Sequence, residues 1–431
     1  MPRTRINNVF LSVVNCINSL VNFEYFIARR IIAAKEYKSS VSAPIIKIAI
    51  VAIALGLIMM LISIATGVGL QKKIREKVSA FQGDIIISNY DTNFSNDSQV
   101  PISIHQDFYP EFTAVPEVTH IQVTALKGGV IRTETDFEGI VLKGVATDYR
   151  WETFEEFLME GSLPDYSGEI SNDVLLSSYL ANRLQLKVGD RITTHFFDEE
   201  SSSKIRSRGF DIVGIYSSGF QEFDEQFMIG DLRHIQLLNR WEEDQIGAFE
   251  LLVNDFDRVG EIGTAVYNET GSDLDTQTIR DKYYSIFEWL DLFDFNIALI
   301  IGIMILVAGI NMITALLVLI LERTQMIGIL KALGSSDWSI RKVFLYNAMY
   351  LIGVGLFWGN VIGIGLLLLQ KYGKFFPLDP DTYYVTEAPV YLDFGYVLLL
   401  NAGTFVLCLV MLLIPSFIIS KISPVKAIRF E

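Results

Sequence analysis

Cysteine is nearly absent from this 431-residue sequence, which contains only Cys16 and Cys408. Neither lies between residues 72 and 294, so the largest polar segment of the chain cannot be a disulfide-stabilised scaffold. At roughly 220 residues, this segment is long enough to bury a hydrophobic core of its own without cross-links.

Charged side chains are missing from four long stretches, residues 48–71, 295–321, 343–370 and 394–420. Each stretch exceeds the ~20 apolar residues that a helix needs to cross a bilayer. We therefore predict four transmembrane helices, at 45–71, 295–321, 343–370 and 394–420. Proton- and ion-coupled transporters usually carry ionisable groups within the membrane, so their absence argues that any transport is driven from outside the spans.

Recognisable catalytic motifs are also lacking. The histidines at 105, 120, 195 and 234 are scattered without the spacing of metal ligands. No phosphate-binding loop of the form Gly-x-x-x-x-Gly-Lys-Ser/Thr occurs, because the one Gly-Lys pair, Gly373 and Lys374, is followed by Phe375. We expect no catalytic, cofactor-binding or metal-binding residues in this chain, which would therefore not be an enzyme.

The charge that is present is divided unevenly along the chain. Residues 72–294 carry 41 acidic and 19 basic residues, a net of −22, whereas the remainder carries 9 and 16, a net of +7. An acidic segment argues against nucleic-acid binding, which needs a basic surface. Basic residues gather in 1–44, 322–342 and 421–431, which predicts that these segments are cytoplasmic and that 72–294 and 371–393 are exported.

The N-terminal segment is not predicted to be a signal peptide. Its uncharged run, residues 6–23, is interrupted by asparagines and lacks a small-x-small cleavage pattern. The residues that follow predict an amphipathic helix lying on the inner membrane surface, with apolar side chains at helical spacing: Phe23, Phe26, Ile27, Ile31 and Ala34. A plain juxtamembrane connector is the alternative interpretation.

Within residues 72–294, short strand patterns alternate with helix patterns. Strands are predicted at 84–88, 129–132, 139–143, 191–196, 210–216 and 249–253. Helices are predicted at 107–113, 151–160, 178–184, 231–239 and 258–270, and a hairpin tip is predicted at 198–204. The sequence thus predicts an α+β domain inserted between the first and second transmembrane helices.

Small residues recur in the third predicted span. Gly355, Gly359 and Gly363 lie four residues apart and form a ridge that lets a neighbouring helix approach closely. Pro415 is expected to kink the fourth helix near its end. Because four helices enclose little space, a passage for a bulky substrate would form between two chains, and we expect a dimer.

The connector at 322–342, ERTQMIGILKALGSSDWSIRK, predicts a short apolar helix that ends at Gly334. Ser335 or Ser336 is the candidate N-cap of the next helix, with Asp337 in its first turn. A short apolar helix at the cytoplasmic side suggests docking onto a partner, and the alternative is that it lies among the lipid headgroups.

This connector resembles that of the FtsX-like permeases of ABC transporters, whose pattern E-x-x-x-x-I-x-I-L-K-A-L-G forms a coupling helix. The resemblance implies that this helix docks onto a separate ATPase subunit, which holds the ATP and Mg. The predicted docking residues are Glu322, Met326, Ile327, Ile329, Leu330, Lys331, Ala332, Leu333 and Gly334. The stretch 174–197 and the C-terminal IISKISPVKAIRF are also similar to the family, so the resemblance covers nearly the whole chain.

Three further segments are most similar to the lipoprotein-releasing permeases of the LolC/LolE type: FIARR at 26–30, VGLQKKIREKVSAF at 68–81 and FDIVGIYSSGFQEFDEQFMIGD at 210–231. The resemblance implies a multi-pass protein of the bacterial inner membrane with the 72–294 domain in the periplasm. It also implies that a triacylated lipoprotein is extruded toward a periplasmic carrier by a pair of permease chains, identical or different.

Two alternatives remain within the same superfamily. A permease resembling the macrolide exporters would transmit motion across the membrane to drive efflux, and such proteins often have a fused ATPase domain, which this sequence lacks. A chain resembling the cell-division member would be a scaffold that activates periplasmic cell-wall hydrolases, although that member usually has a much smaller exported domain.

Overall fold

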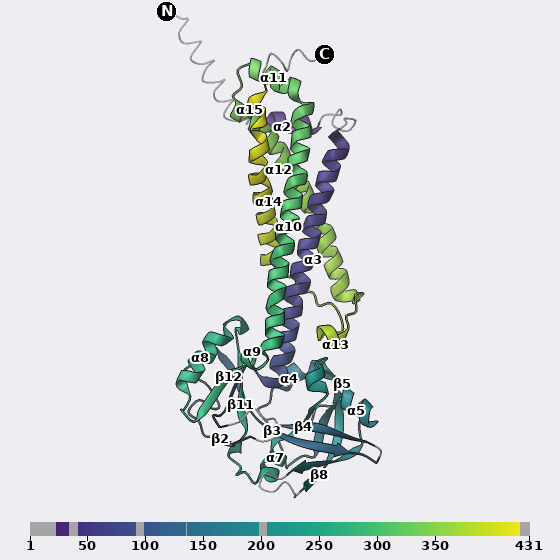
Figure 1. Ribbon diagram of the computed structural model, residues 1–431, viewed down its shortest axis with the longest axis vertical. Coiled ribbons are helices and arrows are strands. Elements are labelled where there is room, and N and C mark those ends of the chain that lie inside the picture. Colours follow the sequence, from purple (N-terminus) through teal and green to yellow (C-terminus); the bar gives the residue numbers. More distant parts are fainter. Residues whose placement is uncertain (1–22, 34–41, 92–98, 135, 198–204, 423–431) are drawn as a thin grey trace, which may run out of the picture. The chain divides into compact units, whose positions relative to one another are not determined.

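The structure, a computed structural model, describes residues 23–33, 42–91, 99–134, 136–197 and 205–422 (Figure 1). The chain divides into two compact units. We call residues 1–69, 292–376 and 389–431 the helical unit, and residues 70–291 and 377–388 the core unit. The segment preceding Phe23, Ala34 of the predicted amphipathic helix and the predicted hairpin tip at 198–204 lie outside the described residues.

The described residues contain four helices long and apolar enough to cross a membrane, as predicted. Two of them extend well beyond the uncharged stretches, because charged residues exclude a segment from the bilayer without ending a helix. These four helices are α3 (Ser42–Gln82), α10 (Tyr284–Glu322), α12 (Asp337–Gly373) and α14 (Phe394–Ser416).

The predicted glycine ridge of α12 lies against α3. A Cβ atom added at Gly355 would lie 2.8 Å from a side-chain carbon of Ile53, and one at Gly359 would lie 3.0 Å from the carbonyl oxygen of Ala54. Gly363 approaches α3 in the same way. The two helices can therefore lie this close only because these positions have no side chain.

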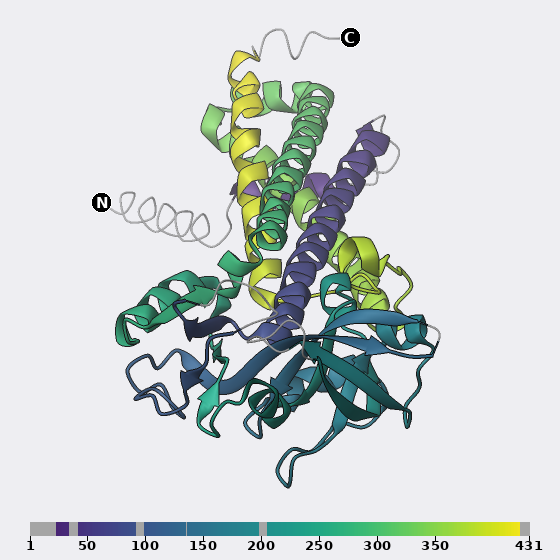
Figure 2. The same cartoon turned by 60° about the horizontal axis from the view of Figure 1, so that its bottom comes forward.

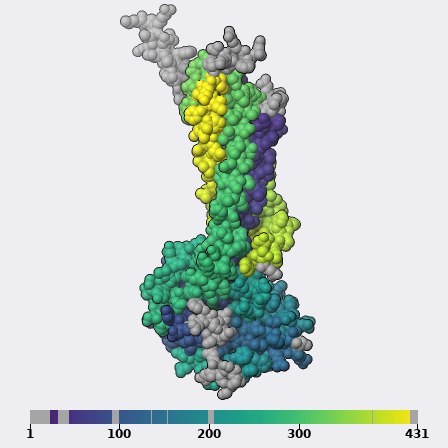
Figure 3. Space-filling view, viewed as in Figure 1, coloured from purple at the N-terminus to yellow at the C-terminus, as the bar shows by residue number. Residues whose placement is uncertain are grey.

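Helix α14 contacts both α10 and α12. In the space-filling view its yellow surface lies beside the green surface of α10 (Figure 3). Asn360 on α12 and Asn401 on α14 exchange side-chain hydrogen bonds of 2.7 and 3.0 Å, and each amide also donates to a carbonyl of its own helix. The chain leaves the helix at Phe417, two residues after Pro415, and continues as the short helix α15 (Ile418–Lys421).

The core unit is built on one large mixed sheet, which Figure 2 turns toward the viewer. Its strands run in the order β12-β1-β11-β3-β4-β9-β6-β8-β5, and β7 pairs with β3 and β8. Most neighbours are antiparallel, but β4 with β9 and β6 with β8 are parallel. The strands are β1 (Ile85–Asn89), β3 (Val118–Arg132), β4 (Phe137–Val145), β5 (Leu158–Gly161), β6 (Asp173–Ser177), β7 (Arg191–Phe197), β8 (Ile205–Tyr216), β9 (Phe227–Asp231), β11 (Ala248–Val253) and β12 (Leu274–Thr278).

Three of the predicted helices of this unit are confirmed, as α5 (Ser178–Leu184), α7 (Leu232–Asn239) and α8 (Val259–Glu269). With the sheet they confirm the α+β class. A small pair of strands, β2 (Ile102–Ser103) and β10 (Gln245–Ile246), stands apart from the large sheet. The unit also contains the short helices α6 (Gln221–Asp224) and α9 (Ile279–Lys282), and α13 (Pro380–Tyr383) lies in the segment 377–388.

Two predicted helices are wrong or truncated. Residues 107–113 form turns, because Phe108 and Phe112 insert into the core with stacked rings and Pro110 lacks the amide that a helix interior requires. Residues 151–160 begin as the single-turn helix α4 (Trp151–Phe154) and the 3₁₀ turn η2 (Glu155–Phe157), then enter strand β5.

A buried ion pair joins two strands that flank β3. Lys143 of β4 and Glu250 of β11 lie 2.6 Å apart, with side chains 0% and 5% exposed. Glu250 also accepts hydrogen bonds from Gln122 and Thr124, while Lys143 donates to the carbonyl of Phe81. Burial lowers the pKa of Lys143, and the adjacent carboxylate opposes that shift.

Candidate functional site

The predicted coupling segment folds as a separate helix, α11 (Thr324–Ala332), which ends in a glycine cap. Gly334 takes a left-handed φ of +94°. The amides of Gly334 and Ser335 donate to the carbonyls of Lys331 and Leu330, each at 3.0 Å. This pair of bonds is the Schellman motif, so the predicted end of the helix is confirmed.

Helix α12 begins directly after this cap. The hydroxyl of Ser336 accepts a hydrogen bond of 3.2 Å from the amide of Ser339, which makes Ser336 the N-cap, and Asp337 lies in the first turn. A negative charge at this end is favourable because the amides at a helix N-terminus carry partial positive charge. The two caps separate α11 from α12, whereas on its other side α11 follows α10 after the single residue Arg323.

Helix α11 presents two different faces. Ile327 and Gly328 are buried, and Met326 and Leu330 pack half-buried against the hydrophobic core of the helical unit. On the other face Ile329 is 47% exposed and Leu333 is 78% exposed. The nine residues predicted to dock an ATPase therefore do not share one surface: Glu322, Ile329, Ala332, Leu333 and Gly334 are exposed, and the other four are partly or fully buried.

Lys331 belongs to the buried group. Its side chain is 10% exposed and forms an ion pair of 2.9 Å with Asp337. Lys331 lies four residues after the buried Ile327 and therefore on the same face of the helix. A lysine ammonium group is nevertheless usually solvated, so its inward direction was not expected from the sequence.

Trp338 is a candidate docking residue that the sequence interpretation missed. It is 52% exposed in the first turn of α12, five residues after Leu333. The signal that could have identified it is a large aromatic residue two positions after an N-cap, where its side chain has no preceding helical turn to pack on. We call Ile329, Leu333 and Trp338 the coupling patch.

The helix predicted to lie on the membrane surface is present as α2 (Phe23–Ala33), and it packs on α12. Ala28 and Ile31 bury against Val343, while Phe23 and Phe26 remain about half exposed. Glu24 accepts a hydrogen bond of 2.7 Å from the hydroxyl of Ser339, and this bond lowers the pKa of Glu24. The placement of α2 at a membrane surface stays a prediction.

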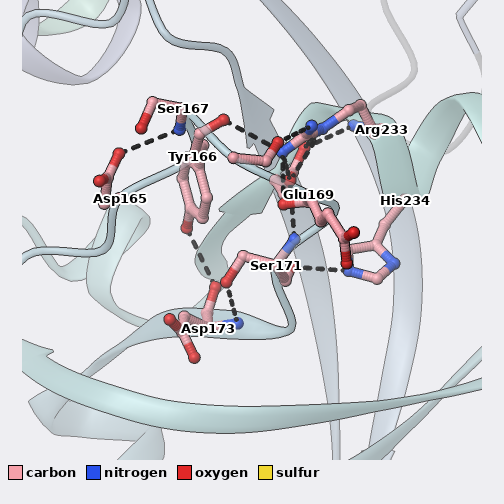
Figure 4. Close-up of polar contacts among 10 residues, drawn as sticks. Asp165, Tyr166, Ser167, Glu169, Ser171, Asp173, Arg233 and His234 are labelled. Atoms are coloured by element: carbon pink, nitrogen blue, oxygen red, sulfur yellow. Dashed lines mark hydrogen bonds and ion pairs between the residues drawn. The ribbon is translucent and has the colours of Figure 1, made fainter.

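The core unit contains a polar cluster that braces one loop (Figure 4). Arg233 pairs with Asp231 and donates to the backbone carbonyls of Tyr166, Gly168 and Glu169 at 2.7–3.1 Å. His234 contacts the carbonyl of Ser171 at 2.8 Å, and burial lowers its pKa. Because the hydrogen bonds that Arg233 and His234 form outside α7 and its cap go to backbone carbonyls, the cluster holds the loop in shape.

No group of three or more histidine, cysteine or carboxylate side chains is placed to hold a metal ion within the part of the chain that the structure describes. The four scattered histidines belong to the core unit, whereas the predicted docking residues belong to the helical unit. The coupling patch is therefore the strongest candidate site in the described chain.

Two family models match the chain. Residues 298–424 match a model described as FtsX-like permease C-terminal, and residues 48–266 match one described as MacB-like periplasmic core domain. The first match includes the coupling patch, and the second includes most of the large sheet.

Two of three individual relatives align over nearly the full length of the chain. The chain is 25% identical over 436 residues to the lipoprotein-releasing system transmembrane protein LolC of Neisseria meningitidis, covering 96% of this chain and 100% of that protein. It is 21% identical to LolE of Haemophilus influenzae, covering 95% and 99%. The macrolide export ATP-binding/permease protein MacB of Hyphomonas neptunium is 26% identical over 201 residues, covering 45% of this chain and 29% of that protein.

Proposed function

Since the chain belongs to the FtsX-like ABC transporter permeases and carries a MacB-like periplasmic core domain, we propose that it releases lipoproteins from a bacterial inner membrane. In this proposal it is a non-catalytic permease subunit with cytoplasmic termini, paired with a second permease chain. A separate ATPase subunit binds and hydrolyses ATP. The released lipoprotein passes toward a periplasmic carrier.

The observation that carries the transport part of this proposal is the coupling patch. Three large apolar side chains are exposed on a short segment in which two caps define the turn between α11 and α12. Burying each such side chain stabilises a complex by about 1.5–3 kcal/mol. A partner that covers all three would gain several kcal/mol, enough to favour a stable subunit contact.

The substrate part is supported by the two relatives named as lipoprotein-releasing proteins, which align over nearly the whole chain. The spans offer a consistent physical environment, because the four predicted membrane stretches contain no charged residue. An uncharged surface open to lipid suits acyl chains and is unfavourable for ions.

The docking claim is tested by replacing Ile329 and Leu333 with Asp in the full chain and measuring co-purification with a P-loop ATPase. We expect both variants to lose the ATPase, because an ionised carboxylate cannot be buried in an apolar contact at acceptable cost. A matched control is Phe137→Asp, since Phe137 is 74% exposed in the core unit. Unchanged co-purification of the Ile329 and Leu333 variants would discard the docking claim.

The substrate claim is tested separately by depleting the protein in cells and fractionating the two membranes. Outer-membrane lipoproteins should accumulate in the inner membrane. Normal lipoprotein sorting together with impaired efflux of a macrolide would instead favour the second candidate, an efflux permease, which the match to the macrolide export protein supports.

A further inference from the structure

We propose that Lys331 is a positioning residue that fastens the coupling helix α11 to the end of the fourth span and makes no contact with the ATPase subunit. This inference rests on the proposed function, because it concerns how motion at the coupling patch reaches the spans. It also removes Lys331 from the docking residues that the family resemblance implies.

The Lys331 ammonium group is surrounded by acceptors from its own chain. Its Nζ donates to the carbonyl oxygens of Ile419 at 2.8 Å, Ile422 at 3.0 Å and, more weakly, Ser420 at 3.4 Å. Asp337 completes the set at 2.9 Å. A lysine ammonium has three donors, so these four acceptors use its full hydrogen-bonding capacity.

The carbonyl acceptors lie at the end of a helix, where the backbone dipoles make a nearby cation favourable. The carbonyl of Ile419 also accepts a hydrogen bond of 3.3 Å from the amide of Ile422, so Lys331 adds a second donor to it. Ile419 and Ser420 belong to α15, which directly follows α14. Lys331 therefore binds the carbonyl end of the short helix that follows the fourth span. Its ion pair with Asp337 links the start of α12 to the same ammonium group.

A second basic residue holds the same segment independently. Arg341 of α12 donates from Nη2 to the hydroxyl of Ser420, and its guanidinium carbon lies 4.1 Å from the ring centroid of Phe417. Figure 1 shows α11 and α15 at the same end of the helical unit. Helix α11, the start of α12 and the end of the fourth span are thus joined by side chains as well as by the backbone.

The mechanical consequence concerns which spans respond when a partner displaces the coupling patch. The backbone connects α11 only to α10 and α12. Lys331 extends the connection to α14 through α15, so displacement of α11 moves three of the four spans. Without the ammonium group, a partner could still bind Ile329 and Leu333, but its motion would reach the fourth span less directly.

The first test uses the isolated full chain in detergent, without any ATPase, and quantifies acylation of individual lysines by mass spectrometry. We expect Lys331 to react several-fold more slowly than Lys342, whose side chain is 41% exposed on the same segment. Asp337→Asn should speed the reaction at Lys331. If Lys331 reacts as fast as Lys342, the internal contact is absent and the proposal is overturned.

The second test uses the chain with its ATPase and compares Lys331→Met, which retains the aliphatic stem, with Lys331→Arg, which retains the charge. We expect Lys331→Met to keep the ATPase bound but to lower the lipoprotein released per ATP hydrolysed several-fold, and Lys331→Arg to restore part of that yield. Loss of the ATPase by Lys331→Met, as in Ile329→Asp, would show that Lys331 is a docking contact and overturn the proposal. Unchanged release would overturn it as well.

The two tests separate failure of this inference from failure of the proposed function. If the unmodified chain retains no ATPase, the proposed function fails, while lysine acylation still decides whether Lys331 is held internally. If Lys331→Met does not fold, the acylation rates of the unmodified chain and of Asp337→Asn decide the outcome.

Discussion

Replacing Lys143 by Met is expected to destabilise the core unit by about 3–5 kcal/mol, because it leaves a buried carboxylate without its counter-ion. Glu250 is 3% exposed and cannot turn to solvent without disrupting strand β11. Its hydrogen bonds from Gln122 and Thr124 remain in the variant, but neither donor carries a charge. Methionine fills nearly the volume of the lysine stem, so the loss reflects charge and not a cavity.

The same structure predicts how a second substitution compensates. Glu250→Gln removes the charge and keeps an oxygen that accepts from Gln122 and Thr124. The double variant Lys143→Met, Glu250→Gln should therefore recover most of the lost stability, since a buried ion pair is often replaceable by neutral groups. A deficit of about 1 kcal/mol should remain, because the carbonyl of Phe81 loses the hydrogen bond from Lys143.

The assay is thermal unfolding of the purified full chain in detergent, followed by hydrogen exchange of peptides from β4 and β11. For a segment of roughly 220 residues, each kcal/mol of lost unfolding free energy lowers the melting midpoint by about 2–4 °C. The melting midpoint of the single variant should therefore fall by about 6–20 °C. The double variant should lie within a few degrees of the unmodified chain. If its loss equals the sum of the two single losses, the two charges do not interact and the reasoning is refuted.

Three further predictions concern other parts of the chain. Trp338→Ala should weaken ATPase binding by roughly tenfold to a hundredfold, as expected for about 1.5–3 kcal/mol of lost burial, and an unchanged Kd would exclude Trp338 from the docking surface. Gly359→Ala should lower the midpoint of unfolding of the helical unit, because its Cβ would meet the carbonyl of Ala54 at 3.0 Å, whereas Gly353→Ala, with open space around it, should not. Burial lowers the pKa of Lys282 to about 8, so between about pH 8 and 10 the folded core unit binds fewer protons than the unfolded chain. Its stability should therefore rise with pH over that window, and Lys282→Gln should reduce the rise in a series of melting curves.

The spans and helix ends could be predicted from sequence because their determinants are local. An uncharged run marks a span, and the Gly334 amide and the Ser336 hydroxyl form hydrogen bonds to residues three positions away. The helix predicted at 107–113 failed for the opposite reason. Its two phenylalanines have apolar spacing compatible with a helix, but burial against strand β11, through Phe249, determines their conformation.

The division of α11 into two faces depended on contacts that lie far away in the sequence. Lys331 and the carbonyl of Ile419 are separated by 88 positions. Helical spacing within residues 322–342 places Lys331 on the face of Ile327, but it cannot identify these distant partners. A family pattern that includes the lysine therefore gives its identity and not its contacts. Trp338 was overlooked because an isolated tryptophan at a helix start is compatible with packing as well as with exposure.

The amide pair between Asn360 and Asn401 has a consequence for how this sequence can vary. All four side-chain donor bonds of the two amides are satisfied, two across the helices and two within them. In lipid no water replaces a lost hydrogen-bond partner. Changing one asparagine to an apolar residue therefore leaves one N–H donor and the carbonyl oxygen of the other side chain without their partners across the helices. We therefore expect the two positions to change together among related sequences. A redesign of the third and fourth helices should treat them as one site.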